Sequence, residues 1–134
     1  MQMQPTIFFS KTYDEALSLV EDSRIYFALI EPLDRKGLGM LDRLHLCSES
    51  LRLTARLTQI MAWLLAQRAV LEGEISRQDA LGDQGTLADL AVCMNRTKEE
   101  CANMPRRLGV LLDRSHKLYV RVARLDELAR RPAL

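Results

Sequence analysis

Metal or redox chemistry would have to come from His45 and Cys47, which lie two residues apart, with help from the distant Cys93 and Cys101. On a helix, residues two apart point to different sides, which is poor geometry for holding one metal ion. The cysteines also lack the close pairs that are typical of zinc knuckles and redox motifs. We therefore expect no metal site and no cofactor, and a metal- or redox-responsive regulator is kept as an alternative.

Hydrolytic chemistry has no better support. Asp113, Ser115 and His116 are close in the sequence, but adjacent residues on a helix do not face one another, and no oxyanion-hole sequence accompanies them. Gly37 and Gly39 lack the spacing of a phosphate-binding loop. We expect no catalytic residues and interpret the chain as a non-enzymatic protein.

A tryptophan on an otherwise polar helix face indicates protein binding instead. Trp63 falls at the centre of this face, and Trp and Arg are the residues most enriched at binding hot spots. The predicted partner-binding residues on this face are Arg52, Arg56, Gln59, Trp63 and Gln67. An exposed indole ring flanked by guanidinium groups would serve as a docking anchor. The alternative is that the first helix, the N-terminal segment with Phe8 and Phe9, or a second subunit covers Trp63.

A second candidate surface is a row of basic side chains opposite the leucines of the last predicted helix, which we call the basic stripe. Its members are Arg106, Arg107, Arg114, Lys117, Arg121 and Arg124. The net charge of only +1 and the scarcity of interleaved aromatics disfavour nucleic acid, so an acidic protein partner fits better. A nucleic-acid-associated regulator is the alternative function, and a solvated face stabilised by Asp113 and neighbouring acids is the structural alternative.

Helices must position these residues. A chain of 134 residues has room for one domain, and its 48% hydrophobic content with only 5% aromatics favours helices over strands. Helical periodicity predicts helices over residues 12–30, 40–73 and 105–129. A capping box at Thr12–Glu15 would begin the first helix and Pro32 would end it. Gly73 would cap the second and Pro105 would begin the third. The prediction is an all-α, antiparallel three-helix bundle with one long central helix.

The apolar residues of the long helix cover an arc of roughly 200°, which is wider than one neighbouring helix requires. One half contains Leu53, Leu57, Ile60, Leu64 and Leu71. The other half, which we call the leucine–alanine face, contains Leu44, Leu51, Ala55, Ala62, Leu65 and Ala69. Each half is expected to meet a neighbouring helix, and the alanines would permit close approach of a symmetric partner, so we expect a homodimer. Residues 76–104 are predicted to be irregular, with a turn at Ser76 and a short helix over 87–94.

Several sequence stretches resemble the bacterial DUF1465 family. They are Glu49–Leu57 (ESLRLTARL), Ala62–Val70 (AWLLAQRAV), Glu72–Ser76 (EGEIS), Tyr13–Leu17 (YDEAL) and Leu118–Asp126 (LYVRVARLD). The resemblance covers most of the chain, and the central stretch is the most specific part of it. The residues that carry the family pattern include Arg52, Arg56, Trp63, Gln67 and Arg68.

The resemblance implies a three-helix bundle, usually dimeric, that acts as an adaptor in regulated proteolysis by the ClpXP protease during the cell cycle. Such an adaptor joins the ClpX unfoldase, through the response-regulator-like protein CpdR, to cargo such as the master regulator CtrA or the cyclic-di-GMP effector PopA. The sequence shows no secretory signal and no apolar run of the roughly 20 residues that span a bilayer. We therefore expect a cytoplasmic protein, recruited to a cell pole with its partners.

Overall fold

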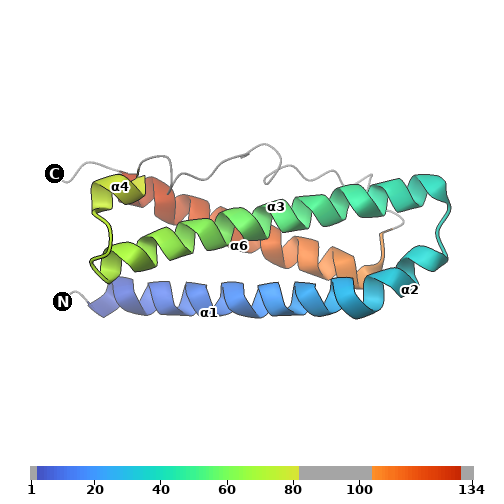
Figure 1. Ribbon diagram of the computed structural model, residues 1–134, viewed down its shortest axis with the longest axis horizontal. Helices are drawn as coiled ribbons and strands as arrows, with labels where there is room; N and C mark the ends of the chain where they lie inside the picture. Colours follow the sequence, from blue (N-terminus) through green and yellow to red (C-terminus); the bar gives the residue numbers. More distant parts are fainter. Residues whose placement is uncertain (1–2, 82–103, 131–134) are drawn as a thin grey trace.

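The computed structural model describes residues 3–81 and 104–130, and all regular structure in these two ranges is helical. The elements are α1 (Met3–Ile25), the π-helical turn η1 (Tyr26–Ile30), α2 (Glu31–Lys36), α3 (Met40–Leu71), α4 (Arg77–Leu81) and α6 (Arg106–Arg130). Figure 1 shows α1, α3 and α6 side by side in an elongated bundle, with the short α2 and α4 at opposite ends. The predicted all-α bundle with one long central helix is confirmed.

The directions of the three long helices follow from the contacts between them. Asp22 and Glu15 of α1 pair with Arg114 and Arg121 of α6, so these two helices are antiparallel. Helices α3 and α6 instead run in the same direction, with α1 antiparallel to both (Figure 1). The chain between residues 72 and 105 therefore connects opposite ends of the bundle.

The first helix begins well before the position predicted from the capping box. Helix α1 starts at Met3, and Thr12 is buried inside it. The rings of Phe9 and Tyr13 stack with their centroids 5.8 Å apart, which is the contact expected one helical turn apart. The prediction of a helix start at Thr12–Glu15 is wrong, because the same spacing of hydroxyl and carboxylate also occurs within a continuous helix.

The prediction that the first helix stops before Pro32 is also wrong. Residues Tyr26–Ile30 form a π-helical turn, in which the backbone N–H of Glu31 donates to the carbonyl of Tyr26, and α2 continues to Lys36. In a regular α-helix the proline ring would collide with the carbonyl four residues earlier, and proline has no N–H to donate. A widened turn directly before Pro32 accommodates the ring, so the chain bends there and remains helical.

The later helix ends agree with the sequence within two residues. Gly73 has φ +76°, its N–H donates to the carbonyl of Val70, and the N–H of Glu74 donates to that of Ala69. This is a Schellman motif, in which glycine tolerates the left-handed backbone that ends α3. The Ser76 hydroxyl accepts a hydrogen bond from the N–H of Asp79 at the start of α4. The short helix predicted over 87–94 lies outside the described residues.

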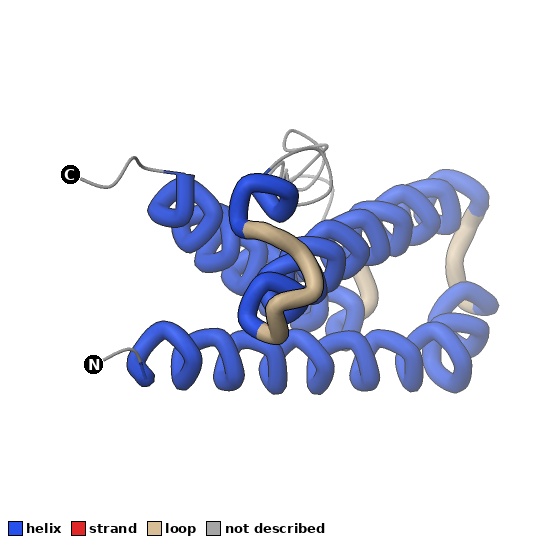
Figure 2. The backbone as a smooth tube through the Cα atoms, turned by 60° about the vertical axis from the view of Figure 1, so that its left-hand side comes forward, coloured by secondary structure: helices blue, strands red, loops and turns tan. Residues whose placement is uncertain are grey.

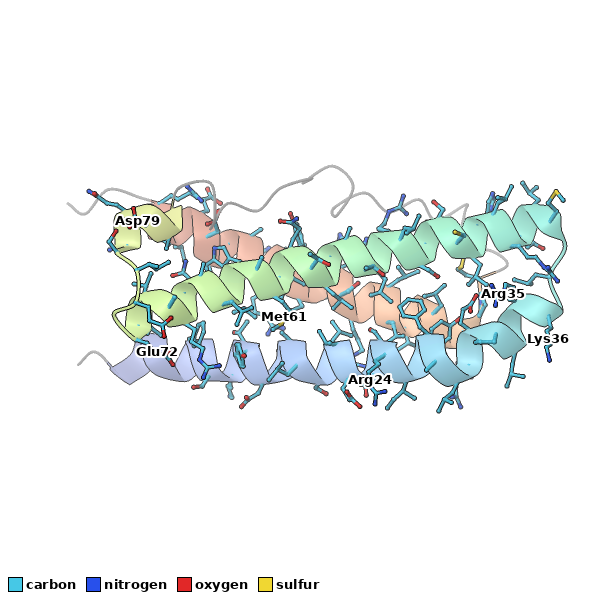
Figure 3. The ribbon with its side chains drawn as sticks, viewed as in Figure 1. Arg24, Arg35, Lys36, Met61, Glu72 and Asp79 are labelled. Carbon is cyan, nitrogen blue, oxygen red and sulfur yellow. The ribbon has the colours of Figure 1, made fainter. Side chains whose placement is uncertain are left out.

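A shared core joins the three long helices. The largest fully buried apolar side chains are Leu19, Tyr26, Leu46, Leu53, Ile60, Leu64, Leu108, Leu118, Tyr119 and Val122. On α3, the first half of the apolar arc is buried as predicted, except for Leu71 near the helix end. Met61 lies between α3 and α1 and packs against this core (Figure 3). The described loops are confined to the stretches between α2 and α3, between α3 and α4, and directly before α6 (Figure 2).

Candidate protein-interaction surfaces

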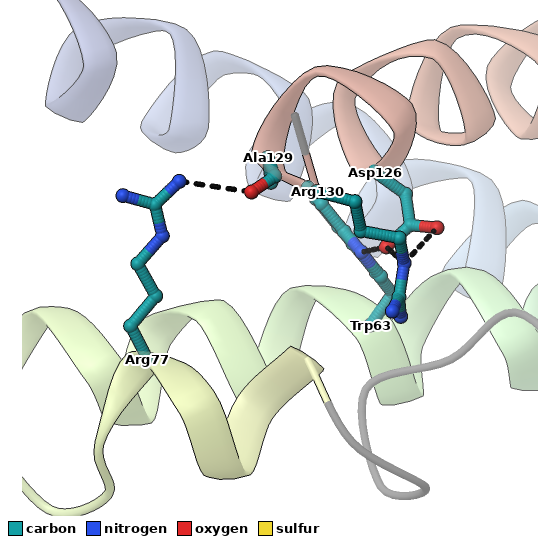
Figure 4. Close-up of polar contacts among 5 residues, drawn as sticks. All are labelled: Trp63, Arg77, Asp126, Ala129 and Arg130. Atoms are coloured by element: carbon teal, nitrogen blue, oxygen red, sulfur yellow. Dashed lines mark hydrogen bonds and ion pairs between the residues drawn. The ribbon is translucent and has the colours of Figure 1, made fainter. Parts of the chain in front are cut away.

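Trp63 is buried, with only 6% of its surface exposed. Its indole N–H donates to the Asp126 carboxylate of α6 at 2.9 Å, and the same carboxylate accepts from Arg130 at 3.0 Å (Figure 4). At this end of the bundle Arg77 of α4 also donates to the carbonyl of Ala129, at 2.8 Å. The interpretation of Trp63 as an exposed docking anchor is wrong. The ring is covered, as the alternative expected, but its hydrogen bond is to α6, an element that the alternative did not name.

Arg56, predicted on the same face, is the largest fully buried side chain, with 1% of its surface exposed. Its guanidinium donates to the carbonyl of Leu112 at 3.0 Å and to the hydroxyl of Ser115 at 3.1 Å, both on α6. A buried charge is tolerated only when it is hydrogen-bonded or paired. Arg52 is partly buried as well and pairs with the buried carboxylate of Glu49. Arg56 therefore joins α3 to α6, Arg52 is paired within α3, and neither arginine forms a free surface.

The two glutamines of the predicted face lie at its edges, where both are half-buried. Gln67 borders a groove of about 250 Å³ that is also lined by Phe9, Val70 and Leu125. Its side-chain Nε2 has no hydrogen-bond partner within residues 3–81 and 104–130. Arg56 and Trp63 both face α6, where Leu112, Ser115 and Asp126 accept hydrogen bonds from their polar ends and so allow the long side chains to be buried.

The leucine–alanine face of α3 is open where the sequence predicted burial against a neighbouring helix. Leu44 and Leu51 are 61% and 65% exposed, and Leu65 is exposed as well. Ala62 between them is exposed too, whereas Ala55 is half-buried. Neither α1 nor α6 covers this face, because they pack on the other sides of α3. An apolar row of this length on a helix surface marks an interaction site more often than ordinary solvated surface.

The basic stripe lies on the surface of α6, and acids on neighbouring turns and on α1 partly neutralise it. Arg114 pairs with Asp22 at 2.8 Å, and Arg121 pairs with Glu15. Lys117 pairs with Asp113 at 3.1 Å, one turn earlier on α6. Arg124 is exposed further along the helix. The alternative of a solvated face stabilised by acids thus describes the middle of the stripe, where exposed pairs contribute at most about 1 kcal/mol each.

The start of the stripe borders a groove that the sequence did not predict, which we call the basic groove. Arg106, Arg107 and Arg114 lie along one side of a hollow of about 440 Å³. The other lining residues are Asp22, Ile25, Tyr26, Ile30, Val110 and Leu111. Residues 22–30 and 106–114 are distant in the sequence, so no local pattern brings them together. The only sequence signal for this groove is the apolar Val110, which lies one helical turn after the pair Arg106 and Arg107.

The π-helical turn shapes one wall of the basic groove. In an α-helix Leu29 would lie above Ile25, but a π-helical turn places residues five apart on the same side, and both Ile25 and Ile30 line the groove. The buried Tyr26 between them donates its hydroxyl to Asp34 at 2.9 Å. Burial, together with this hydrogen bond and the carboxylate charge, raises the pKa of Tyr26 well above its ordinary value. The ring is therefore a neutral, fixed part of the wall at neutral pH.

Within the described ranges, the structure contains neither a candidate metal-binding cluster nor a helix that could span a membrane. Within residues 3–81 and 104–130, no three His, Cys, Asp or Glu side chains gather closely enough to hold a metal ion. His45 is half-buried and Cys47 is exposed, whereas Cys93 and Cys101 fall outside these ranges. None of the helices in the described part of the chain is both long and apolar enough to cross a bilayer.

These features define a helical-bundle protein with an open apolar helix face and a basic groove. The family model for DUF1465, described as a protein of unknown function, matches residues 1–134, and the chain belongs to this family. Among solved structures, it is similar to RcdA from Caulobacter crescentus CB15, with 35% sequence identity and a TM-score of 0.73. That similarity covers 90% of this chain and 89% of RcdA. No curated protein sequence matches the chain.

Proposed function

We propose that the protein is a non-enzymatic adaptor that regulates ClpXP-dependent degradation of a CtrA-type cell-cycle regulator through protein–protein contacts. The observation that carries this proposal is the 35% identity to RcdA over nine-tenths of both chains, with the same fold. The family resemblance of the sequence implies the same role. The proposed partners are the ClpX unfoldase, reached through a CpdR-like regulator, and cargo such as CtrA or a PopA-like effector. The proposed setting is the cytoplasm, with recruitment to a cell pole alongside these partners.

An adaptor needs a surface for its partners, and the basic groove between the α1–η1 segment and α6 offers one. Arg107 and Arg114 of the predicted binding set border this groove, and Lys117, Arg121 and Arg124 continue from it along α6. We keep these five residues as the proposed contact set. We assign Arg56 and Trp63 to the fold because they are hydrogen-bonded to α6, and Arg52 because it pairs with the buried Glu49 within α3.

The adaptor function is tested with purified components. The protein is immobilised and incubated with ClpX, a CpdR-like regulator and CtrA or PopA-like cargo, and ClpXP degradation of the cargo is followed with and without it. We expect capture of the regulator-bound unfoldase or the cargo, and faster cargo degradation when all components are present. Capture no better than that by the empty matrix, with a folded protein by circular dichroism, would refute the adaptor function.

We also propose that the leucine–alanine face joins two copies of this chain. A face with leucines separated by small alanines is complementary to itself, because alanines allow two helices to approach closely and leucines fill the space between them. Leu51→Glu places a charge at the centre of the face. Leu33→Glu on α2 is the matched control, since Leu33 and Leu51 are equally exposed. Sedimentation should show a dimer for the wild type and Leu33→Glu, and a monomer for Leu51→Glu. A monomeric wild type, or a dimeric Leu51→Glu, would refute this interface.

A further inference from the structure

The basic groove combines positive charge with an apolar floor. Arg106, Arg107 and Arg114 contribute three guanidinium groups, and among the lining residues in the described part of the chain Asp22 contributes the only carboxylate. Arg114 already pairs with Asp22 at 2.8 Å. The charges of Arg106 and Arg107 are therefore in excess on this side of the groove. An occupant that complements them carries negative charge.

The start of α6 adds to this positive potential. The first backbone N–H groups of a helix have no partner within the helix, and the helix dipole places partial positive charge there. The first turn of α6 contains no acidic residue that would compensate it. Pro105 precedes the helix and has no N–H, so the backbone N–H groups of Arg106 and Arg107 are the first donors of the helix.

The groove also has an apolar and partly exposed portion, to which both α6 and the α1–η1 segment contribute. Val110 on α6 is 51% exposed, and Ile25 on α1 is exposed as well. With Ile30, brought onto the same wall by the π-helical turn, they enclose space for one large aliphatic or aromatic side chain. A free anion such as phosphate would leave this apolar part unused, whereas a purely apolar ligand would leave the two arginines without a partner.

We propose that the basic groove binds a short acidic peptide segment of a protein partner, with one large apolar side chain between Val110 and the Ile25–Ile30 wall and flanking carboxylates on Arg106 and Arg107. Planar guanidinium groups suit carboxylates because they donate two parallel hydrogen bonds. This inference rests on the adaptor function and deepens it, because it gives the chemistry by which one partner is recognised.

Fluorescence polarisation with three labelled peptides tests the proposal on the full chain. The first peptide has one leucine flanked by glutamates, the second replaces the leucine by serine, and the third replaces the glutamates by lysines. We expect the first to bind, the second to bind about tenfold more weakly, and the third not to bind. Binding of the first should weaken as salt is added, because part of it is ionic.

Two pairs of variants assign the binding to the groove. Arg107→Glu should weaken binding of the first peptide at least about tenfold, whereas Lys11→Glu, an equal charge change at an exposed position of α1 outside the groove and outside the contact set, should not. Val110→Ser should weaken binding, whereas Leu128→Ser, at a similarly exposed position of α6, should not. All four positions are exposed, so each variant should melt within a few degrees of the wild type, checked by circular dichroism.

Equal effects of Arg107→Glu and Lys11→Glu, equal binding of the leucine and serine peptides, or an oligonucleotide that displaces the first peptide would each overturn the proposal. The outcome is separable from that of the adaptor function. If the wild type captures ClpX, the CpdR-like regulator or cargo but not the peptide, the groove proposal is wrong and the adaptor function stands. If the peptide binds as expected but no component of the protease system is captured, the groove proposal stands and the adaptor function is wrong.

Discussion

Replacing Trp63 by alanine is expected to destabilise the fold strongly. The indole ring is 6% exposed and packs in the core, and its N–H donates to Asp126 at 2.9 Å. Truncation of a buried tryptophan to alanine typically costs about 3–5 kcal/mol, because the packing is lost and a cavity remains. A domain of this size has about 5–15 kcal/mol of stability in total, so the variant should lose a large part of it.

Trp63→Phe separates the ring from its hydrogen bond. Phenylalanine retains most of the apolar contact but has no N–H for the Asp126 carboxylate, which keeps its pair with Arg130. We expect a cost of about 1–3 kcal/mol, the range for a hydrogen bond to a charged group. Leu33→Ala is the surface control, since Leu33 is largely exposed and lies outside the proposed dimer interface, so its truncation should change stability by less than about 1 kcal/mol.

Urea unfolding followed by far-ultraviolet circular dichroism measures these differences. Tryptophan fluorescence is unsuitable because Trp63 is the only tryptophan of the chain. The midpoint should move to lower urea in the order Leu33→Ala, Trp63→Phe, Trp63→Ala, with an unchanged slope. If Trp63→Ala changed the free energy of unfolding by less than about 0.5 kcal/mol, the ring would be at the surface and the packing described for α3 and α6 would be refuted.

Three further outcomes are expected. Gly73→Ala should destabilise the fold by about 1–2 kcal/mol because Gly73 has φ +76°. Gly109→Ala should stabilise it by about 0.5–1 kcal/mol because Gly109 lies within α6 and an added Cβ meets nothing within 4 Å. Melting temperatures that shift in the same direction for both variants would contradict this. Asp22→Asn should cost less than about 1 kcal/mol at low salt and nothing in concentrated salt, since its pair with Arg114 is half-exposed; a salt-independent loss would contradict it. Folding raises the pKa of Tyr26, so the unfolded chain releases the phenolic proton at lower pH than the folded chain does. The free energy of unfolding should therefore fall as the pH rises above about 10. It should fall less steeply in Tyr26→Phe.

Periodicity was sufficient to predict that three long helices exist, but not where the first of them begins and ends. The long run without glycine or proline became α3, and Gly73 ends it because only a residue tolerant of positive φ suits the Schellman motif. The prediction that the first helix stops before Pro32 failed because the rule that proline ends a helix assumes an α-helical turn before the proline. The π-helical turn removes the collision, and no property of residues 26–30 alone announces it.

The surfaces were harder to predict because the pattern of α3 does not specify its neighbours. Arg56 and Trp63 have polar ends that identify them as surface residues, yet Ser115 and Asp126 on α6 satisfy those ends and allow burial. Leu51 looked like a core residue and is exposed. Which side of α3 receives α6 depends on a parallel pairing between distant segments, and single-helix projections contain no information on such pairing.

The parallel pairing of α3 and α6 also bears on the order in which the chain folds. The hydrogen bonds from Arg56 to Ser115 and from Trp63 to Asp126 join residues that are 59 and 63 positions apart. The α1–α3 hairpin needs only the short turn after α2, so its contacts close a smaller loop at a lower entropic cost. We therefore expect the hairpin to form first and α6 to dock last. Until then a chain emerging from the ribosome presents the Arg56–Trp63 side of α3 to its surroundings, and α6 acts as the chain's own ligand for it.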